Sequence, residues 1–229
     1  IVILISYLNI SGSNEKFRIN NIFCIGKNYM EHIKEFGNDK APNSPVIFFK
    51  PNTAIIRNNS IINIPEINGK KISDDVHYET EMVIAIGKDG NNVNEAEAGE
   101  YILGYGVGLD LTLRDLQSTA KKKGLPWGTA KGFYNSAPVS DIVLKSFIKD
   151  PLNLDLQLKI NNTIKQFSNT SLMIINIYKI ISYLSTIFGL SKGDLIFTGT
   201  PEGVGRLKRG DELLANLGDL IELKVSFNG

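Results

Sequence analysis

The fold of this chain is decided by one stretch, His77-Tyr78-Glu79-Thr80-Glu81-Met82-Val83-Ile84-Ala85-Ile86-Gly87. Its apolar half ends at a glycine and predicts a β-strand. Because successive side chains of a strand point to opposite faces, we expect His77, Glu79 and Glu81 to share one face. The stretch therefore predicts a strand from which two carboxylates project together.

Glu79 and Glu81 can be interpreted in two ways. Two carboxylates this close, with no cation between them in the sequence, repel each other unless something neutralises them. A divalent cation is the simplest neutralising group and would make the pair part of a metal site. The alternative is a solvated strand edge that carries two acids and has no further role.

The segment that follows supplies further candidate residues. Ile102 to Leu109 is a glycine-spaced run typical of a strand, and its glycines indicate either close packing of the backbone against a site or merely a bulged strand. Asp110 ends this run and is a suitable N-cap for a helix predicted over 111–122, a structural role that competes with metal ligation. Lys131 follows Trp127 in an otherwise apolar segment, and a partly buried lysine needs a partner such as a nearby carboxylate.

The bulk composition fits one globular domain over residues 1–229, of which 42% are hydrophobic and 21% charged. Lys and Arg number 25 against 24 Asp and Glu, so the charge balance predicts neither nucleic acid nor a membrane as a partner. Cys24 is the only cysteine, which excludes an internal disulfide and fits a reducing compartment, either cytoplasmic or an organelle matrix. Residues 1–20 are expected to form an edge strand and a lead-in to the domain.

A second pair of candidate residues lies nearer the amino terminus. Residues 27–36 predict a short polar helix that follows a strand over 22–26 and ends at Gly37. His32 and Glu35 are three residues apart and therefore neighbours on one face of it, where the carboxylate would orient the imidazole and raise its pKa. The pair is either a candidate general base or an ordinary surface ion pair.

The rest of the chain alternates apolar runs with turn residues. Asn58-Asn59 between two apolar runs predicts a hairpin over 53–64. An apolar helix, part of the core or of a subunit contact, is predicted over 172–190. A strand over 195–198 leads into Gly199-Thr200-Pro201-Glu202-Gly203-Val204-Gly205, a rigid loop whose hydroxyl and backbone amides could bind an anion.

Short motifs also recur in a definite order along nearly the whole chain. They are Ile25-Gly26-Lys27-Asn28-Tyr29-Met30-Glu31-His32, Phe48-Phe49-Lys50-Pro51, His77-Tyr78-Glu79-Thr80-Glu81, Gly106-Val107-Gly108-Leu109-Asp110-Leu111-Thr112-Leu113-Arg114-Asp115-Leu116-Gln117, Lys123-Gly124-Leu125-Pro126-Trp127, Ala130-Lys131 and Thr198-Gly199-Thr200-Pro201-Glu202-Gly203-Val204-Gly205. Each motif is weak alone. Together and in this order, they resemble the fumarylacetoacetate hydrolase superfamily, specifically its small single-domain, acylpyruvase-like members.

This resemblance implies a strand-rich α+β fold, a mixed β-roll or sandwich of the fumarylacetoacetate hydrolase C-terminal-domain type with a few flanking helices. It also implies a homodimer and a Mg²⁺ or Mn²⁺ ion held by Glu79, Glu81 and Asp110. The residue chemistry agrees with that ligand set. Three carboxylates without cysteine suit a hard, oxygen-preferring ion and leave positions for waters and a chelating substrate.

The activity implied by the resemblance is hydrolysis of the carbon–carbon bond of acylpyruvates, which are 2,4-dioxo acids, to pyruvate and a carboxylic acid. His32, oriented by Glu35, would activate the attacking water. Lys131 would help the cation to stabilise the departing enolate. The substrate-binding residues would be Arg114, Gln117, Gly199 and Thr200. Residues 27–45 would form a mobile lid over the substrate.

Other functions are compatible with the same residues. Oxaloacetate chelates a metal in the same way, so the site could decarboxylate it or interconvert its keto and enol forms as a tautomerase. A hydratase or isomerase acting on dioxo acids is a more distant alternative, and a non-catalytic protein that binds metal and carboxylate is another. Tyr78 departs from the family pattern, in which near relatives often have a second histidine, and the role of His77 is left open.

Overall fold

The computed structural model describes residues 6–35, 37, 40–42 and 44–229 of the chain. Strands dominate the structure. They are β1 Tyr7–Asn9, β2 Lys16–Arg18, β3 Ile22–Gly26, β4 Val46–Lys50, β5 Ile55–Arg57, β6 Ser60–Ile62, β7 Glu66–Ile67, β8 Lys70–Lys71, β9 Val76–Tyr78, β10 Thr80–Ile86, β11 Ile102–Leu109, β12 Thr112–Leu113, β13 Ala137–Val139, β14 Val143–Leu144, β15 Asp155–Ile160, β16 Thr163–Asn169, β17 Leu195–Phe197, β18 Gly205–Arg206, β19 Glu212–Leu217 and β20 Ile221–Phe227. The α-helices are α1 Met30–Glu35, α2 Ala98–Tyr101, α3 Arg114–Lys123, α4 Gly128–Lys131 and α5 Ile177–Phe188, and the short 3₁₀ helices are η1 Asn52–Ala54, η2 Glu95–Glu97, η3 Lys145–Phe147 and η4 Thr170–Leu172. The strand-rich α+β architecture predicted from the sequence is confirmed.

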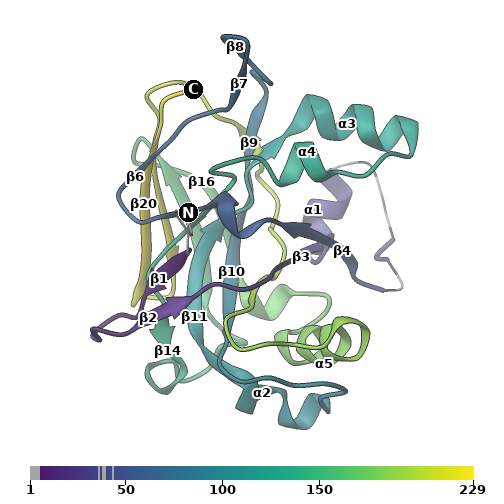
Figure 1. Cartoon of the computed structure of the whole chain (residues 1–229), viewed down its shortest axis with the longest axis vertical. Coiled ribbons are helices and arrows are strands. Elements are labelled where there is room, and N and C mark those ends of the chain that lie inside the picture. The colour runs from purple at the N-terminus through teal and green to yellow at the C-terminus, as the bar shows by residue number, and fades with distance from the viewer. Residues whose placement is uncertain (1–5, 36, 38–39, 43) are drawn as a thin grey trace, which may run out of the picture.

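Two large sheets form the body of the molecule (Figure 1). The first has eight strands in the order β4-β3-β17-β10-β11-β13-β5, with β14 paired to β11. The second has five strands, β16-β15-β19-β20-β6, and a small sheet, β12-β9-β18, stands beside them. Strand β10 contacts β15, and β11 contacts β19 and β20, so the two large sheets pack against each other. In Figure 1, α1, α3 and α4 gather on one side of the curled long sheet, where they surround the ends of β3 and β4.

Strand β10 lies at the centre of the core because both of its faces are apolar. Every residue of β10 is buried. Met82, Ile84 and Ile86 pack into one hydrophobic cluster. Val83 and Ala85 pack into a second cluster on the opposite face. The continuous apolar run after Glu81 is therefore the signature of a strand covered on both sides, as parallel and mixed sheets require.

The glycines of β11 are needed for close packing inside the core. A Cβ atom on Gly108 would lie 2.7 Å from the Phe197 ring and 2.9 Å from the Val83 side chain, closer than side chains tolerate. β11 pairs with β10, β13 and β14 along its length. The neighbours of Gly108 are core side chains and not a site, and the register of β10 with β11 shifts between Ala85 and Ile86, opposite Gly104 and Ile102, as a bulged strand would show.

The hairpin predicted over 53–64 is wrong. Strand β5 pairs in parallel with β13 in the eight-stranded sheet, whereas β6 pairs in parallel with β20 in the five-stranded sheet. Asn59 adopts a left-handed backbone conformation with φ 61, which turns the chain sharply between the two strands. The Asn-Asn signal thus marks a true turn, but the turn carries the chain from one sheet to the other.

Two helices begin later than predicted. Asp110 is not an N-cap, because the short strand β12 separates it from α3, whose N-cap residue is Leu113. The apolar helix α5 begins only after Asn176, whose side-chain oxygen accepts hydrogen bonds from the backbone N–H groups of Tyr178 and Lys179, both at 3.0 Å. That capping interaction ends the preceding irregular segment and starts the helix.

The region predicted as a mobile lid, 27–45, is described only in part. Its helix α1 spans Met30–Glu35, which is shorter than the predicted 27–36. Residues 36, 38–39 and 43 lie outside the described residues, as do residues 1–5 of the predicted amino-terminal edge strand. The lid therefore stays a prediction. Across the part of the chain that the structure describes, no helix is both long and apolar enough to cross a membrane.

Candidate active site

A cavity of about 560 Å³ opens between α1, α3 and the amino-terminal end of β10. It is lined by all the residues selected from the sequence as site residues except Glu35 and Gly199. The lining residues are Ile25, Gly26, Lys27, His32, Ile33, Val46, Phe48, Glu79, Glu81, Asp110, Arg114, Gln117, Ser118, Lys121, Trp127, Lys131 and Thr200. The cavity thus brings together residues that are up to 175 positions apart in the sequence, from Ile25 to Thr200.

Three carboxylates meet at the bottom of this cavity, and strand register explains why. Strands β10 and β11 are antiparallel, with Thr80 opposite Leu109. Glu79, just before β10, and Asp110, just after β11, are therefore neighbours. The backbone N–H of Asp110 donates a hydrogen bond to the carbonyl oxygen of Glu79 at 2.8 Å. One carboxylate oxygen from each of Glu79, Glu81 and Asp110 lies within 4.8 Å of the others. We call these three residues the carboxylate trio.

The carboxylate trio is buried, which excludes the interpretation of Glu79 and Glu81 as a solvated strand edge. Glu79, Glu81 and Asp110 are exposed by only 5%, 2% and 0%. Ionised carboxylates withdrawn from water to this degree need compensating charge. The protein supplies part of that charge with three cations.

Lys131 is the cation nearest the centre of the trio. Its Nζ lies 2.7 Å from Glu79 Oε2 and 2.6 Å from Asp110 Oδ2. Arg114 Nη2 binds the other oxygen of Glu79 at 2.5 Å, and Lys50 Nζ lies 2.8 Å from Asp110 Oδ1. The need for a carboxylate partner inferred for Lys131 from its sequence context is met in full.

The pKa values of the trio diverge because the cations are unevenly distributed. Burial alone would raise the pKa of Glu79, but the Lys131 and Arg114 cations outweigh it and hold that pKa well below its usual value. Burial raises the pKa of Glu81 well above its usual value, and the negative charges of Asp110 and Glu79 raise it further. In the described part of the chain, the side chain of Glu81 has no cationic partner, and its Oε2 accepts one hydrogen bond, from Gly199 N–H at 2.7 Å.

The carboxylate trio fits a divalent metal ion. Its donors are all carboxylate oxygens, the ligands preferred by Mg²⁺ and Mn²⁺. Glu81 is the member whose charge is least compensated by the protein. A divalent cation placed among the three oxygens would supply that missing charge.

His32 and Glu35 form a contact at the cavity wall, and they are not an ordinary surface pair. His32 Nδ1 lies 3.3 Å from Glu35 Oε2, and the two side chains are exposed by 12% and 33%. Glu35 Oε1 also accepts a hydrogen bond from Gly203 N–H at 3.2 Å, which ties α1 to the loop after β17. Burial lowers the pKa of His32 below its usual value. Glu35 raises that pKa, as predicted, and Glu79 does so too, but together they do not offset burial.

The loop 199–205 supports the trio through Gly199, whose N–H donates a hydrogen bond to Glu81. Gly199 has φ +98, and a Cβ atom there would lie 2.7 Å from Asn28, so only glycine fits. Thr200 Oγ1 accepts a hydrogen bond from Gln166 Nε2 at 2.9 Å, and Gln166 Oε1 in turn accepts one from Thr80 N–H at 3.0 Å. A buried glutamine therefore links this loop to the start of β10.

His77 does not share the site with Glu79 and Glu81. Its Nε2 lies 3.1 Å from Asp75 Oδ1, and it does not line the cavity. The alternation expected along the strand fails because the chain forms two separate strands, β9 and β10, with Glu79 between them. The face shared by Glu79 and Glu81 is confirmed, and the extension of that face to His77 is wrong.

Two buried polar residues of the site had no functional prediction. Lys50 donates hydrogen bonds to the carbonyl oxygens of Leu111, Lys131 and Ser136. Gln166 lies on β16 in a segment whose sequence reads as an exposed hairpin strand. The lysine between Phe49 and Pro51 was a visible anomaly in an apolar strand, whereas nothing in the local sequence distinguishes Gln166.

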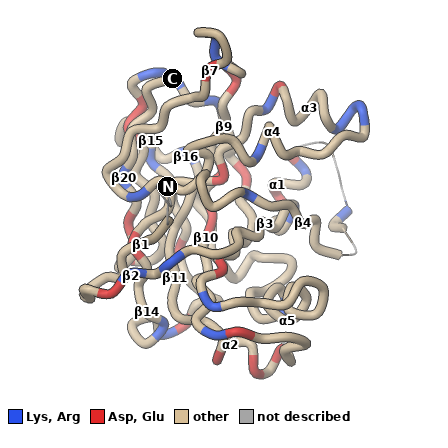
Figure 2. The backbone as a smooth tube through the Cα atoms, in the orientation of Figure 1, with Lys and Arg blue, Asp and Glu red and all other residues tan. Residues whose placement is uncertain are grey.

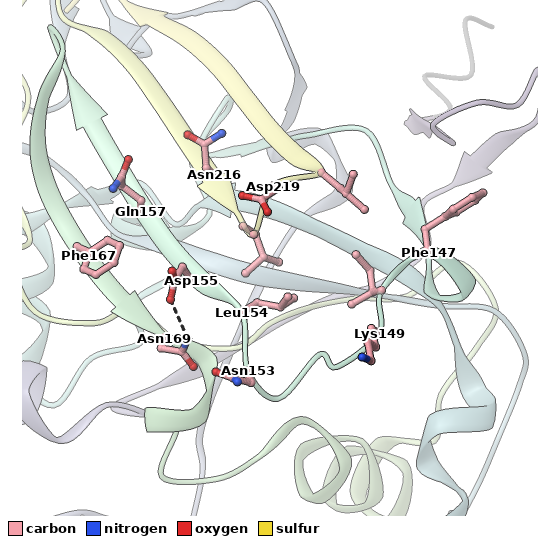
Figure 3. Close-up of a pocket in the computed structure, with 14 residues that line it drawn as sticks. Phe147, Lys149, Asn153, Leu154, Asp155, Gln157, Phe167, Asn169, Asn216 and Asp219 are labelled. Atoms are coloured by element: carbon pink, nitrogen blue, oxygen red, sulfur yellow. Dashed lines mark hydrogen bonds between the residues drawn. The ribbon is translucent and has the colours of Figure 1, made fainter.

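A second hollow, larger in volume, lies away from this chemistry (Figure 3). Its volume is about 740 Å³, and it lies between the β15–β16 hairpin, the turn between β19 and β20 and the segment 147–149. Figure 3 shows Asp155 bonded to Asn169, with exposed Phe147 and Phe167 at either side. The smaller cavity with the carboxylate trio is therefore the better candidate for an active site, because it alone of the two concentrates buried charges.

Comparison with known proteins agrees with this geometry. Residues 21–228 match the family model described as fumarylacetoacetate (FAA) hydrolase C-terminal. The bovine protein oxaloacetate tautomerase FAHD1, mitochondrial, is 44% identical over 204 residues, which cover 89% of this chain and 90% of that protein. The Arabidopsis thaliana protein of the same name is 42% identical over 203 residues, covering 89% and 88%. Fumarylpyruvate hydrolase from Pseudomonas aeruginosa, solved with Mn²⁺ and pyruvate, is 35% identical with a TM-score of 0.91, covering 99% of this chain and 97% of that one.

Proposed function

This chain belongs to the fumarylacetoacetate hydrolase family, and from that premise we propose that it is a divalent-metal-dependent enzyme that interconverts the keto and enol forms of oxaloacetate. The observation that carries the proposal is the meeting, in one cavity, of the carboxylate trio, a fixed ammonium group and an imidazole of lowered pKa. The names of the relatives from cattle and Arabidopsis thaliana support oxaloacetate as the substrate.

Glu79, Glu81 and Asp110 are the proposed ligands of a Mg²⁺ or Mn²⁺ ion. When bound, this ion would act as a Lewis acid toward the negative charge that develops on oxygen during enolisation. The Mn²⁺ in the P. aeruginosa hydrolase supports a divalent ion for this site.

Lys131 acts as a fixed positive charge and not as a base. Burial would lower its pKa, but the charges of Asp110 and Glu79 outweigh burial and raise it, so the ammonium keeps its proton at neutral pH. Because its position is held by two ion pairs, it can stabilise a developing oxyanion without reorganisation. Arg114 and Gln117, which are hydrogen-bonded to each other at 2.8 Å, complete the anion-binding wall of the cavity.

His32 is the proposed proton carrier. Glu35 accepts from Nδ1–H, which assigns the basic lone pair to Nε2. Nε2 would take the proton from C3 of the keto acid and return it to the oxygen of the enolate, so no atom is gained or lost in the reaction. A lowered pKa keeps this imidazole neutral at physiological pH, the state that a base requires.

The proposal is tested by following enol-oxaloacetate, which absorbs in the ultraviolet, as it converts to the keto form. We expect the protein to accelerate this conversion with Mg²⁺ or Mn²⁺ and to lose the effect in excess EDTA. In D₂O, the enzyme should also speed deuterium incorporation at C3. Absence of acceleration from a protein that still binds Mn²⁺ would overturn the assignment.

Acylpyruvate hydrolysis is the second candidate, and the His32–Glu35 contact is the observation that favours it. The same imidazole could deprotonate a water that attacks the 4-carbonyl of a 2,4-dioxo acid, releasing pyruvate. The pyruvate bound to the P. aeruginosa hydrolase supports a ligand of this class. Pyruvate release from acetylpyruvate at a rate exceeding the tautomerisation of oxaloacetate would make hydrolysis the principal reaction.

The pH dependence of either reaction should report His32. Its pKa is lowered from 6.5, so the neutral base persists below pH 6.5 and the rate should fall only at more acidic pH, as the imidazole gains its proton. The measurement is kcat against pH at saturating Mn²⁺, for the parent protein and for His32→Ala. We expect the substitution to lower kcat by about a hundredfold or more and to remove this acidic limb.

The second histidine provides the matched control. His77 is bonded to Asp75 and lies outside the cavity lining. His77→Ala should leave the position of the acidic limb unchanged. If His77→Ala shifted the limb while His32→Ala left it in place, the assignment of the base would be wrong.

A further inference from the structure

The mouth of the cavity carries positive charge that the carboxylate trio does not balance. Lys27, from the turn after β3, and Lys121, from the end of α3, both line the cavity. Among the residues that the structure describes, neither lysine forms an ion pair with a carboxylate. The inner cations Lys50, Arg114 and Lys131 pair with Glu79 and Asp110, so these two lysines form a separate group, which we call the cationic rim.

An aromatic residue holds Lys121 at the rim. Its Nζ lies 5.1 Å from the centroid of the Trp127 ring, within the range of a cation–π contact. Trp127 is itself packed against Phe48, with ring centroids 5.9 Å apart, and both rings line the cavity. Within the described part of the chain, Lys122, the residue after Lys121, does not line the cavity. Figure 2 shows this run of basic residues at the end of α3.

More cations than carboxylates lie close enough to Lys121 to affect its pKa. The pKa of Lys121 is lowered, first by partial burial and then by the Arg114 and Lys131 cations, with Lys27 adding to the effect. Glu79 opposes this shift and does not cancel it. A lysine satisfied by an acidic side chain would show the opposite shift, as Lys131 does. A cleft lined by one sign of charge concentrates ligands of the other sign.

Lys27 reaches the rim through an unfavourable backbone conformation. Its φ is 60, in the left-handed region, which is unfavourable for a residue other than glycine. The conformation is maintained by the next residue, Asn28, whose buried side chain donates to the carbonyl oxygens of Thr198 and Ile175 at 2.8 and 3.0 Å. A strained residue kept in place by its surroundings at a cavity mouth is typical of a functional site.

We propose that Lys121, supported by Lys27 and Trp127, binds the distal carboxylate of a substrate whose 2-oxo acid end lies at the carboxylate trio. The enzyme would then prefer dicarboxylic over monocarboxylic 2-oxo acids. This inference rests on the proposed function only in taking the ligand to be a small 2-oxo acid. The three inner cations carry as many positive charges as the three carboxylates carry negative ones. Adding a divalent ion and the two lysines of the cationic rim therefore leaves an excess of positive charge. A dianion offsets that excess better than a monoanion does.

The test is a binding measurement that does not depend on turnover. The Mn²⁺-loaded protein is titrated calorimetrically with 3,3-difluoro-oxaloacetate, a diacid that cannot enolise because C3 carries no hydrogen. A parallel titration uses pyruvate, which has no distal carboxylate. We expect Lys121→Met to weaken binding of the diacid by about fivefold to tenfold and binding of pyruvate by less than about twofold.

Two variants serve as controls on the same helix. Lys122→Met removes an equal charge one residue away from the cavity lining and should leave both affinities unchanged. Lys121→Arg should restore most of the diacid affinity, because it keeps the charge. Raising the salt concentration should reduce the difference between the parent protein and Lys121→Met.

The outcomes separate this inference from the proposed function. If Lys121→Met binds both acids as the parent protein does, or weakens both equally, the cationic rim does not recognise a distal carboxylate. If the diacid preference depends on Lys121 but oxaloacetate is not tautomerised, the rim proposal stands and the proposed reaction fails. If oxaloacetate is tautomerised but the protein shows no preference for the diacid, the proposed reaction stands and the rim proposal fails.

Discussion

Replacing Glu81 with glutamine is expected to abolish metal-dependent activity and yet to stabilise the metal-free protein. Glu81 is the buried carboxylate whose pKa is raised, by burial and by the charges of Asp110 and Glu79. A neutral amide relieves that repulsion, so the free energy of unfolding in EDTA should rise by about 1 kcal/mol. The same change removes a proposed ligand, so the activity and the affinity for Mn²⁺ should each fall at least about a hundredfold.

The measurements are denaturant unfolding in EDTA, Mn²⁺ titration by calorimetry and the tautomerase assay. Glu222→Gln, which changes an exposed glutamate on β20, is the matched control and should alter none of the three.

The pH dependence of metal-free stability supplies a further check on the raised pKa of Glu81. With a raised folded pKa, the folded protein keeps a proton that the unfolded chain releases, so metal-free stability should fall as pH rises above the usual glutamate range. Glu81→Gln should flatten this slope. A variant that was both less stable and still able to bind Mn²⁺ would refute the role given to Glu81.

Replacing Lys131 with methionine is expected to destabilise the metal-free protein severely. Lys131 is 3% exposed and forms ion pairs with Glu79 and Asp110. Removing one partner of a buried ion pair leaves uncompensated charge and costs about 3–5 kcal/mol. Catalysis should also fall by about a hundredfold or more, since a fixed positive charge next to the developing oxyanion is lost.

The two effects can be separated by adding metal. Mn²⁺ supplies positive charge to the same carboxylates, so it should raise the melting temperature of Lys131→Met more than that of the parent protein. Activity should stay low even in saturating Mn²⁺. Lys224→Met, on an exposed position of β20, controls for loss of a lysine. Equal metal-free stability of Lys131→Met and the parent protein would contradict the buried charge balance described above.

The sequence by itself determined the central strand β10 and the pairing of Glu79 with Glu81 on one face. The apolar run after Glu81 was sufficient to predict β10, and the i, i+2 spacing of Glu79 and Glu81 was sufficient to bring their side chains together. These features follow from local geometry, because alternation along a strand depends only on neighbouring residues. The spacing of His32 and Glu35 on a helix was predictable for the same reason.

The tertiary structure decided which of these residues share a site. Asp110 became a member of the carboxylate trio because antiparallel register sets it beside Glu79, and not because of its position before a helix. His77, two residues from Glu79, was excluded because the chain changes strands between them.

The polar residues that support the trio are also a product of the tertiary structure. Lys50 and Gln166 reach the site from strands whose local sequence gives no information on what they approach. The turn at Asn58-Asn59 likewise could not reveal that its two strands pair with different sheets. Local sequence specifies which direction a side chain takes from the backbone. The partners that it meets, and therefore its charge state and chemistry, depend on long-range pairing that only the folded chain defines.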